Sequence, residues 1–237
     1  MSEKLYKYLP PERTGFYKNI DDTIMPGFFP NLTLIASKLS DLNDPFEGIL
    51  AFSNIYPKEH INELRDGFYK IVNSRLGVIS LSRKSDSIPM WAYYAKGHTG
   101  FVVEIDRCRN ENIFLKPSKR NADFKDINYV DDLIKSPKKL SDFPVEIFHT
   151  KSKEWSHENE VRIMLPRDPN SNTDKPNLWE FNPQVISGII FGMKMEKCYK
   201  TEIIKYCSVN SNLSHIKLYQ AKLSTTEYKI QIEQLSI

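Results

Sequence analysis

The chain has 237 residues, of which 40% are hydrophobic and 27% charged, a balance typical of a globular protein with a sizeable core. Its formal net charge of +3 is too small to indicate nucleic-acid binding by itself, and no apolar run approaches the ~20 residues of a membrane helix. Residues 1–4 lack an apolar signal region, and the three cysteines form no Cys-x-x-Cys pair, so we expect a cytoplasmic protein without a disulfide framework or a zinc site.

The N-terminal residues predict a short strand. Residues 4–9 alternate around aromatic side chains, and Pro10 stops the pattern. On this strand Lys7 lies on the opposite face from Tyr6 and Tyr8. Lys7 is either a surface lysine or a cation that faces a phosphate or a ribose.

Two further strands, a turn and a helix follow. Residues 32–37 predict a strand, and the Asn, Asp, Pro and Gly of residues 41–48 predict a turn held by side-chain hydrogen bonds and anchored by Phe46. Apolar residues at three- and four-residue steps predict a helix over 57–76, ended by Gly77. A strand is expected at 78–82.

Ser80 and Ser82 share one face of that strand, so they either line a polar site or fill a strand position. A short helix is expected over 88–95, with Trp91 on its core side and Tyr93 facing a ligand.

His98 lies in the Gly-rich turn that follows, before a strand over 101–105. Its ordinary pKa of about 6.5 suits an acid or a base, but a lone histidine in a glycine turn is more often a hydrogen-bonding brace, which we favour.

The chain is organised around residues 154–164. Alternation sends Glu158, Glu160 and Arg162 to one face of a strand and apolar residues to the other. Arg162 would keep both carboxylates ionised, and such a pair suits a sugar hydroxyl and a developing cation. Alternatively, the stretch is a solvated edge strand with an ion pair.

The C-terminal part predicts a short strand at 178–181 and a strongly buried strand at 185–192. A helix over about 196–207 and an antiparallel pair of strands, 215–223 and 227–235, complete the chain. We therefore expect the α+β class, as a single domain over 1–237 with mixed and antiparallel sheets and a few short helices.

Several segments together resemble a bacterial family catalogued as domain-of-unknown-function family 2971, whose members resemble proteins found near phage-defence loci. The segments that carry this resemblance are residues 5–8, 43–47, 80–82, 90–100, 153–162 and 189–192. They span most of the chain up to Gly192, and the resemblance implies no settled activity.

A more distant resemblance is to ADP-ribosyltransferases of the arginine–serine–glutamate type. It implies a split sheet, NAD as substrate and no metal. By this resemblance Lys7 holds a ribose or phosphate, Ser82 and Ser80 order the nicotinamide pocket, Glu160 binds the ribose, and Glu158 orients the acceptor. The same resemblance implies an NAD site that also includes the following residues: Tyr8, Trp91, Tyr93, His98 and Arg162. Lys7 departs from the arginine of that signature, so a bidentate grip on phosphate is lost.

The first functional hypothesis is therefore an NAD-dependent ADP-ribosyltransferase-like effector, or an NAD glycohydrolase, in anti-phage defence or a toxin–antitoxin system. A carboxylate beside the breaking nicotinamide–ribose bond stabilises the positive charge that builds on the sugar. Its acceptor would be a protein or nucleic acid, with an antitoxin or defence-system protein as partner and no membrane.

Two alternatives remain. One is a non-catalytic sensor or binding module of a defence system. The other is a metal-dependent nuclease that uses Asp44, Glu47, Glu158 and Glu160, although Arg162 on the same face opposes cation binding.

Overall fold

The computed structural model describes residues 2–16, 27–51, 57–135, 144–168 and 175–236. It contains an eight-stranded sheet in the order β13-β12-β11-β4-β1-β3-β9-β6, a three-stranded sheet in the order β2-β10-β5, and the pair β7-β8. The strands are β1 (Lys4–Leu9), β2 (Thr33–Ile35), β3 (Leu76–Ser82), β4 (Phe101–Asp106), β5 (Phe114–Lys116), β6 (Phe124–Asp126), β7 (Asn128–Val130), β8 (Thr150–Ser152), β9 (Glu160–Pro166), β10 (Leu178–Phe181), β11 (Ile186–Phe191), β12 (Lys217–Leu223) and β13 (Ile230–Gln234).

The α-helices of the described residues are α1 (Ile61–Arg75), α2 (Ile88–Tyr93) and α3 (Lys197–Val209). All pairings in the large sheet are antiparallel except β11 with β12, which run parallel with α3 between them in the chain. The expected α+β class with mixed sheets is confirmed. Within the described residues, no helix combines the length and the apolar character needed to cross a bilayer.

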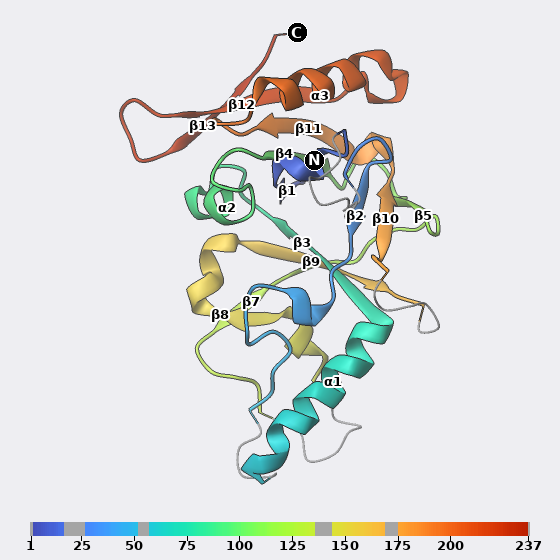
Figure 1. Ribbon diagram of the computed structural model, residues 1–237, viewed down its shortest axis with the longest axis vertical. Coiled ribbons are helices and arrows are strands. Elements are labelled where there is room, and N and C mark those ends of the chain that lie inside the picture. The colour runs from blue at the N-terminus through green and yellow to red at the C-terminus, as the bar shows by residue number, and fades with distance from the viewer. Residues whose placement is uncertain (1, 17–26, 52–56, 136–143, 169–174, 237) are drawn as a thin grey trace.

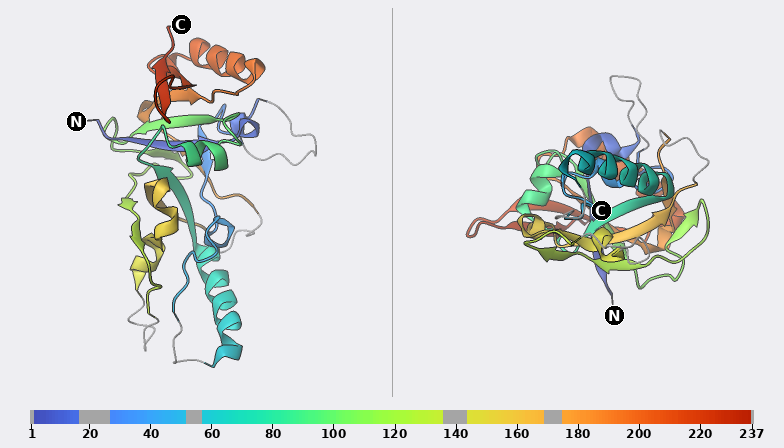
Figure 2. Two further views of the ribbon diagram at one scale, coloured as in Figure 1. Left: turned by 90° about the vertical axis from the view of Figure 1, so that its left-hand side faces the viewer. Right: turned by 90° about the horizontal axis from the view of Figure 1, so that it is seen from below.

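The long axis of the molecule separates two ends. Figure 1 shows α3 and the β12–β13 hairpin at one end and α1 at the other, with β1, β3 and β9 between them. The side view in Figure 2 shows β3 running on directly from α1 towards the centre of the molecule. The strands that carry the predicted site residues, β1, β3 and β9, therefore meet at the centre of the molecule (Figure 1).

Strand β1 lies between β4 and β3, and β3 in turn lies beside β9. Tyr6 is paired with Ser82, and Ser82 is paired with Glu160 on the far side. The N-terminal strand β1, the strand β3 that carries Ser80 and Ser82, and the strand β9 that begins at Glu160 are thus consecutive neighbours, although they come from three distant parts of the chain.

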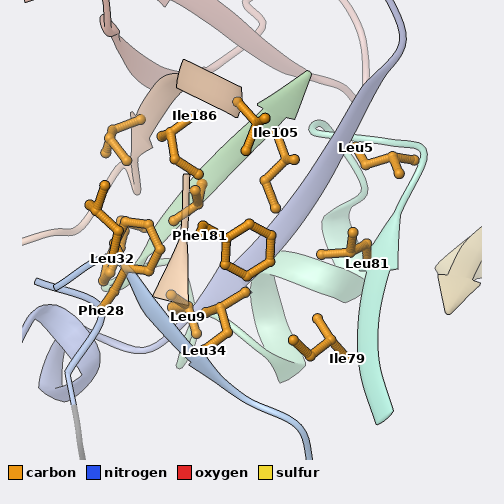
Figure 3. Close-up of a cluster of buried hydrophobic side chains, with 14 of the residues drawn as sticks. Leu5, Leu9, Phe28, Leu32, Leu34, Ile79, Leu81, Ile105, Phe181 and Ile186 are labelled. Atoms are coloured by element: carbon orange, nitrogen blue, oxygen red, sulfur yellow. The ribbon is translucent and has the colours of Figure 1, made fainter. Parts of the chain in front are cut away.

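The main core lies on the face of these strands where apolar residues alternate. Ile79 and Leu81 of β3 and Val161 and Ile163 of β9 are buried there, as the predicted alternation requires. They pack with Leu5 and with residues of the three-stranded sheet, and Figure 3 shows part of this cluster. Because these side chains face the core, the alternating polar residues of the same strands must face the opposite way.

A second, smaller core lies under α2. Trp91 packs there with Tyr8 of β1, Val102 of β4 and Ile190 of β11. Strand β11 is buried at every position, as predicted, and so is β4.

Two local predictions are wrong. Helix α1 passes directly into β3, so Gly77 lies inside the strand, where a Cβ would stand 2.7 Å from the carbonyl oxygen of Ala36. Phe46 is 55% exposed and anchors nothing, because the buried Asp44 carboxylate holds the turn by accepting a 2.9 Å hydrogen bond from the Phe46 N–H.

Candidate functional site

Five of the predicted site residues line one hollow of about 200 Å³ in the centre of the molecule, here called the carboxylate hollow: Lys7, Tyr8, Ser80, Glu158 and Glu160. Lys7 comes from β1, Ser80 from β3 and Glu160 from β9, while Glu158 comes from the turn before β9. The side chain of Lys151, from β8, completes this polar wall. Residues that the sequence separates by about 150 positions are thereby brought together.

Glu158 reaches the hollow by a different route from the one predicted. It ends a 3-10 helix over Lys153–Glu158, and Asn159 then takes the left-handed conformation with φ of 44°. Asparagine tolerates this backbone region better than most residues. Strand β9 therefore begins only at Glu160, and a tight turn, rather than strand alternation, places the two carboxylates on the same side.

Glu160 and Arg162 form a buried ion pair. The Arg162 Nε donates to Glu160 Oε1 at 2.7 Å and its Nη2 donates to Oε2 at 3.1 Å. Burial pushes the pKa of Glu160 upward, but the charges of Arg162 and Lys151 outweigh it and lower that pKa to about 2. Glu160 is therefore ionised at any physiological pH. A solvated edge strand is wrong for this segment, because both side chains are buried and β9 has neighbours on both sides.

Arg162 does not hold both predicted carboxylates. Its second partner is Glu47, to whose Oε2 its Nη1 donates at 2.8 Å, and it also donates to the Phe148 carbonyl at 2.9 Å. Glu47 is buried and belongs to the turn at 41–48, where the sequence indicated it for the nuclease alternative. Arg162 is fully buried and fixes the carboxylates of Glu160 and Glu47 through its hydrogen bonds.

Lys151 is the functional residue that sequence reasoning missed. Its Nζ donates to Glu158 Oε2 at 2.6 Å and Glu160 Oε2 at 3.3 Å, and lies 3.5 Å from Glu47 Oε1. Burial lowers its pKa, but Glu160 and Glu158 more than compensate, so the pKa is raised and the ammonium stays charged. The only signal in the sequence was an imbalance, since Arg162 alone cannot neutralise two buried glutamates.

The aromatic wall also differs from the expectation. Tyr94, which follows α2, lines the carboxylate hollow and donates its hydroxyl to Glu158 Oε1. Burial and then the Glu158 charge raise the pKa of Tyr94, so its hydroxyl remains a donor. Tyr93 is 65% exposed and packs edge-on against His157 outside the hollow. The phase of the predicted helix is right, since Trp91 and Ala95 are buried and Tyr93 is exposed, but the hollow lies on the side of Tyr94 and not on that of Tyr93.

Trp91 is fully buried in the smaller core, where its Nε1 donates to the Ser85 carbonyl at 2.8 Å and Tyr8 packs on it in a T-shaped contact. Such a ring has no free face for a ligand. Tyr8 lies on the wall of the carboxylate hollow, but its hydroxyl donates a 2.7 Å hydrogen bond to the Lys84 carbonyl.

The two serines have different surroundings. Ser82 is fully buried, donates to the backbone carbonyl of Glu158 at 2.6 Å and accepts from the Lys84 N–H at 3.1 Å. It therefore fixes the turn that carries Glu158. Ser80 lines the hollow and helps to lower the pKa of Glu160 through a side-chain hydrogen bond.

His98 lies outside the hollow. Its backbone N–H donates to the Trp91 carbonyl at 3.1 Å, its carbonyl accepts from the Lys194 N–H at 3.0 Å, and its ring stacks on Trp91. Burial, and then Lys194, lower its pKa. The hydrogen bonds that brace this turn thus come from the His98 backbone, whereas its ring Nδ1 is buried without a hydrogen-bond partner among the described residues.

Lys7 donates to the backbone carbonyl of Ser80 at 2.9 Å. Burial lowers its pKa to about 8, with Arg13 adding to this effect and Glu160 and Glu158 opposing it. Lys7 is thus a readily deprotonated amine within electrostatic reach of the two carboxylates and of the Arg13 guanidinium.

This arrangement presents fixed, ionised carboxylates to a cavity through hydrogen bonds that need no rearrangement. Fixed charges of this kind stabilise a developing cation. A divalent cation would need the place among the carboxylates that the Lys151 ammonium takes. In the part of the chain that the structure describes, no group of His, Cys, Asp and Glu has a metal-binding arrangement.

Comparison with protein families gives one match. Residues 90–163 match a family described as a protein of unknown function, DUF2971, which supports for this stretch the resemblance found in the sequence. The matched residues include Tyr94, Lys151, Glu158 and Glu160 of the carboxylate hollow, whereas Lys7 and Ser80 precede them. No curated protein and no solved structure matches the chain.

Proposed function

We propose that the protein is an NAD-cleaving enzyme that breaks the nicotinamide–ribose bond in the carboxylate hollow and passes ADP-ribose to a macromolecule or to water. The single observation that carries this proposal is that Lys7, Ser80 and Glu160 line one hollow on three consecutive strands. A basic residue, a serine and a glutamate in this chain order are what the resemblance to ADP-ribosyltransferases calls for. We also propose, as part of the same assignment, that the large sheet and the three-stranded sheet correspond to the split sheet of that family.

In the proposed reaction Glu160 is the carboxylate next to the sugar. As the glycosidic bond breaks, positive charge builds on the ribose, and an ionised group stabilises this charge more than it stabilises the neutral ground state. The low pKa of Glu160, about 2, supports this role because the carboxylate is charged before the substrate arrives. Ser80 beside it supplies a hydroxyl for orientation.

Glu158 and Tyr94 form the other side of the proposed site. Tyr94 replaces Tyr93 and Trp91 as the aromatic residue for the nicotinamide ring, because it is the one on the wall of the hollow. Glu158, held by Tyr94 and Lys151, orients the acceptor. Ser82 and Arg162 position these groups without touching the substrate.

The biological setting of the proposal comes from the resemblance to the family of unknown function. We propose an effector of bacterial anti-phage defence or of a toxin–antitoxin system, acting in the cytoplasm on a protein or nucleic acid, with NAD as the consumed substrate and a defence-system protein or antitoxin as partner. Expression in bacteria should then slow growth and lower cellular NAD.

The test is incubation of the pure protein with NAD and measurement of free nicotinamide. The wild type should release nicotinamide, and Glu160→Gln, which keeps the shape but loses the charge, should release it at least about 10²-fold more slowly. Glu154→Gln is the matched control, because Glu154 is an exposed glutamate in the 3-10 helix that carries Glu158. It should retain full activity.

Because Glu160 belongs to a buried ion cluster, each variant also needs a thermal unfolding curve. A folded Glu160→Gln protein with undiminished nicotinamide release would contradict the assignment. Release from none of the proteins, including the wild type with cell extract as a source of acceptor, would contradict the enzyme.

One observation favours a second candidate, a binding module without turnover. Both carboxylates are already neutralised, Glu160 by Arg162 and Glu158 by Lys151. Neutralised carboxylates stabilise a developing cation less, yet they still accept hydrogen bonds from a bound ligand. This candidate predicts saturable NAD binding in calorimetry and intact NAD after long incubation.

A further inference from the structure

A larger hollow of about 500 Å³, here called the basic hollow, adjoins the carboxylate hollow. The two share five residues of their walls, which are Lys7, Tyr8, Ser37, Asp41 and Tyr94. A ligand in one therefore has direct access to the other. The two volumes together lie within the roughly 300–1,000 Å³ of small-molecule sites, whereas the carboxylate hollow alone is too small.

The charge reverses between the two hollows. Besides Lys7, the wall of the basic hollow contains Arg13, Lys38, Arg167 and Lys175, against the single carboxylate of Asp41. This is a local excess of cations in a chain whose formal net charge is only +3. Cations concentrated in a concave site focus a positive potential on whatever binds there.

Two arginines of this wall have their positions fixed in different ways, Arg13 through its backbone and Arg167 through its guanidinium. Arg13 belongs to the 3-10 helix Pro11–Thr14 that directly follows β1, and its carbonyl accepts from the Phe28 N–H at 2.6 Å. Arg167 follows β9, is buried, and donates from Nη1 to the Lys175 carbonyl at 2.9 Å. A planar guanidinium is the side chain best suited to the paired oxygens of a phosphate.

Arg13 has an unmet requirement. Its Nε is buried and, within the described residues, has no hydrogen-bond partner. Buried donors are nearly always paired, so an orphan on the wall of a hollow indicates a ligand that completes it. Arg13 and Lys7 line the same hollow, and the Arg13 charge lowers the pKa of Lys7.

We infer that the basic hollow binds the diphosphate of a nucleotide, with Arg13 and Arg167 on the phosphate oxygens, and so fixes the direction in which the substrate lies. The inference rests on the proposed function only for the placement of the ribose; the diphosphate site stands on the basic hollow alone. The ribose enters the carboxylate hollow, where the cations Lys151 and Arg162 are already paired with Glu158 and Glu160, and the diphosphate lies across Lys7 towards Arg13. The substrate class is therefore a nucleoside diphosphate derivative, and an uncharged nucleoside binds poorly.

The test is calorimetric titration of the full chain with ADP, ADP-ribose and adenosine. ADP should bind at least about tenfold more tightly than adenosine, since charge-assisted hydrogen bonds to phosphate are among the strong ones. Arg13→Gln should remove most of this difference and leave adenosine binding unchanged. Lys205→Gln, an equal charge change at an exposed position of α3, should change neither.

Equal affinity for ADP and adenosine, or an unchanged ADP affinity in a folded Arg13→Gln protein, would overturn the inference. Lys175→Gln is a second variant, at an exposed position, with the same expectation in case Arg13→Gln does not fold. A single-stranded RNA that binds more tightly than ADP and loses its binding with Arg13→Gln would replace the diphosphate site with a nucleic-acid site.

Failure here is distinct from failure of the proposed function. ADP binding that depends on Arg13, without any cleavage of NAD, retains the diphosphate site and ends the proposed reaction. Nicotinamide release with a KM for NAD that Arg13→Gln leaves unchanged retains the reaction and ends the diphosphate site.

Discussion

The two faces of β9 are both buried, yet they are built on opposite principles. On one face Val161, Ile163 and Leu165 pack into the main core with apolar residues of several strands. On the other face Glu160 and Arg162 are just as inaccessible, but each is enclosed by opposite charges. One face is stabilised by removing apolar surface from water, and the other exists only because each charge has its partner.

This difference teaches where specificity lies in the molecule. An apolar face tolerates exchanges of similar volume, because dispersion contacts do not depend on direction. The charged face requires particular atoms at hydrogen-bonding distance, which come from the turn at 41–48, from β8 and from β9 itself. The variants below compare the two faces, from the largest expected effect to the smallest.

Arg162→Leu should have the largest effect. It leaves the carboxylates of Glu160 and Glu47 buried without their main cation, which should lower the free energy of unfolding by about 3–5 kcal/mol. Ile163→Val, the neighbouring residue on the apolar face, should lower it by only about 0.5–1.5 kcal/mol. Urea unfolding measures both. Similar losses for the two variants would show that the charged face contributes no more than ordinary packing.

Acid should weaken the charged face selectively. The pKa of Glu160 falls from its ordinary 4.5 to about 2 in the folded protein, so its ionised form stabilises the fold above pH 4.5. That stabilisation should disappear progressively as the pH falls from about 4.5 to 2. Glu160→Gln should flatten this part of the curve of unfolding free energy against pH, whereas Ile163→Val should shift the curve without changing its slope.

Ser82→Ala should have an intermediate effect. The change leaves the buried Glu158 carbonyl without its 2.6 Å donor and the part-buried Lys84 N–H without its acceptor, which should lower the unfolding free energy by about 1–3 kcal/mol. Ser80→Ala, two residues earlier on the same face, should lower it by less than about 1 kcal/mol, because water in the hollow can replace the hydroxyl. The opposite order would mean that Ser82 does not position Glu158.

The smallest expected effect concerns the titration of Lys7. Its pKa should lie near 8 in the folded protein, measured by NMR on ¹³C-methylated lysines and assigned by the loss of one signal in Lys7→Gln. Since this pKa is depressed, Lys7 stabilises the fold above its ordinary pKa of 10.5, and that contribution is lost as the pH falls through about 8. Arg13→Gln should raise the midpoint and Glu160→Gln should lower it. An unmoved midpoint in both would contradict the position of Lys7 between the two hollows.

The sequence was a good guide wherever the pattern is local. Alternation in residues 78–82 and 160–165 correctly separated the core-facing residues from the polar ones, because side chains alternate between the two faces of a pleated strand. In residues 4–9 it does not, since Leu5 and Leu9, on the same face as Lys7, belong to the main core. Periodicity was a poorer guide to the site at Glu158 and Tyr93. A left-handed Asn159 interrupts the strand after Glu158. At Tyr93 the predicted helical phase was right, but the hollow lies against Tyr94, because the packing of distant strands decides which side of the helix lines it.

By itself, the sequence determined the strands and their polar faces. It also showed which carboxylates would need a partner of opposite charge if they were buried. Only the tertiary structure decided which partner each one received. Lys151, Glu47 and Tyr94 join the site through packing between distant segments, and no local pattern fixes such distances. The physical reason is that burial makes a charge dependent on its neighbours in space, whereas periodicity reports only its neighbours along the chain.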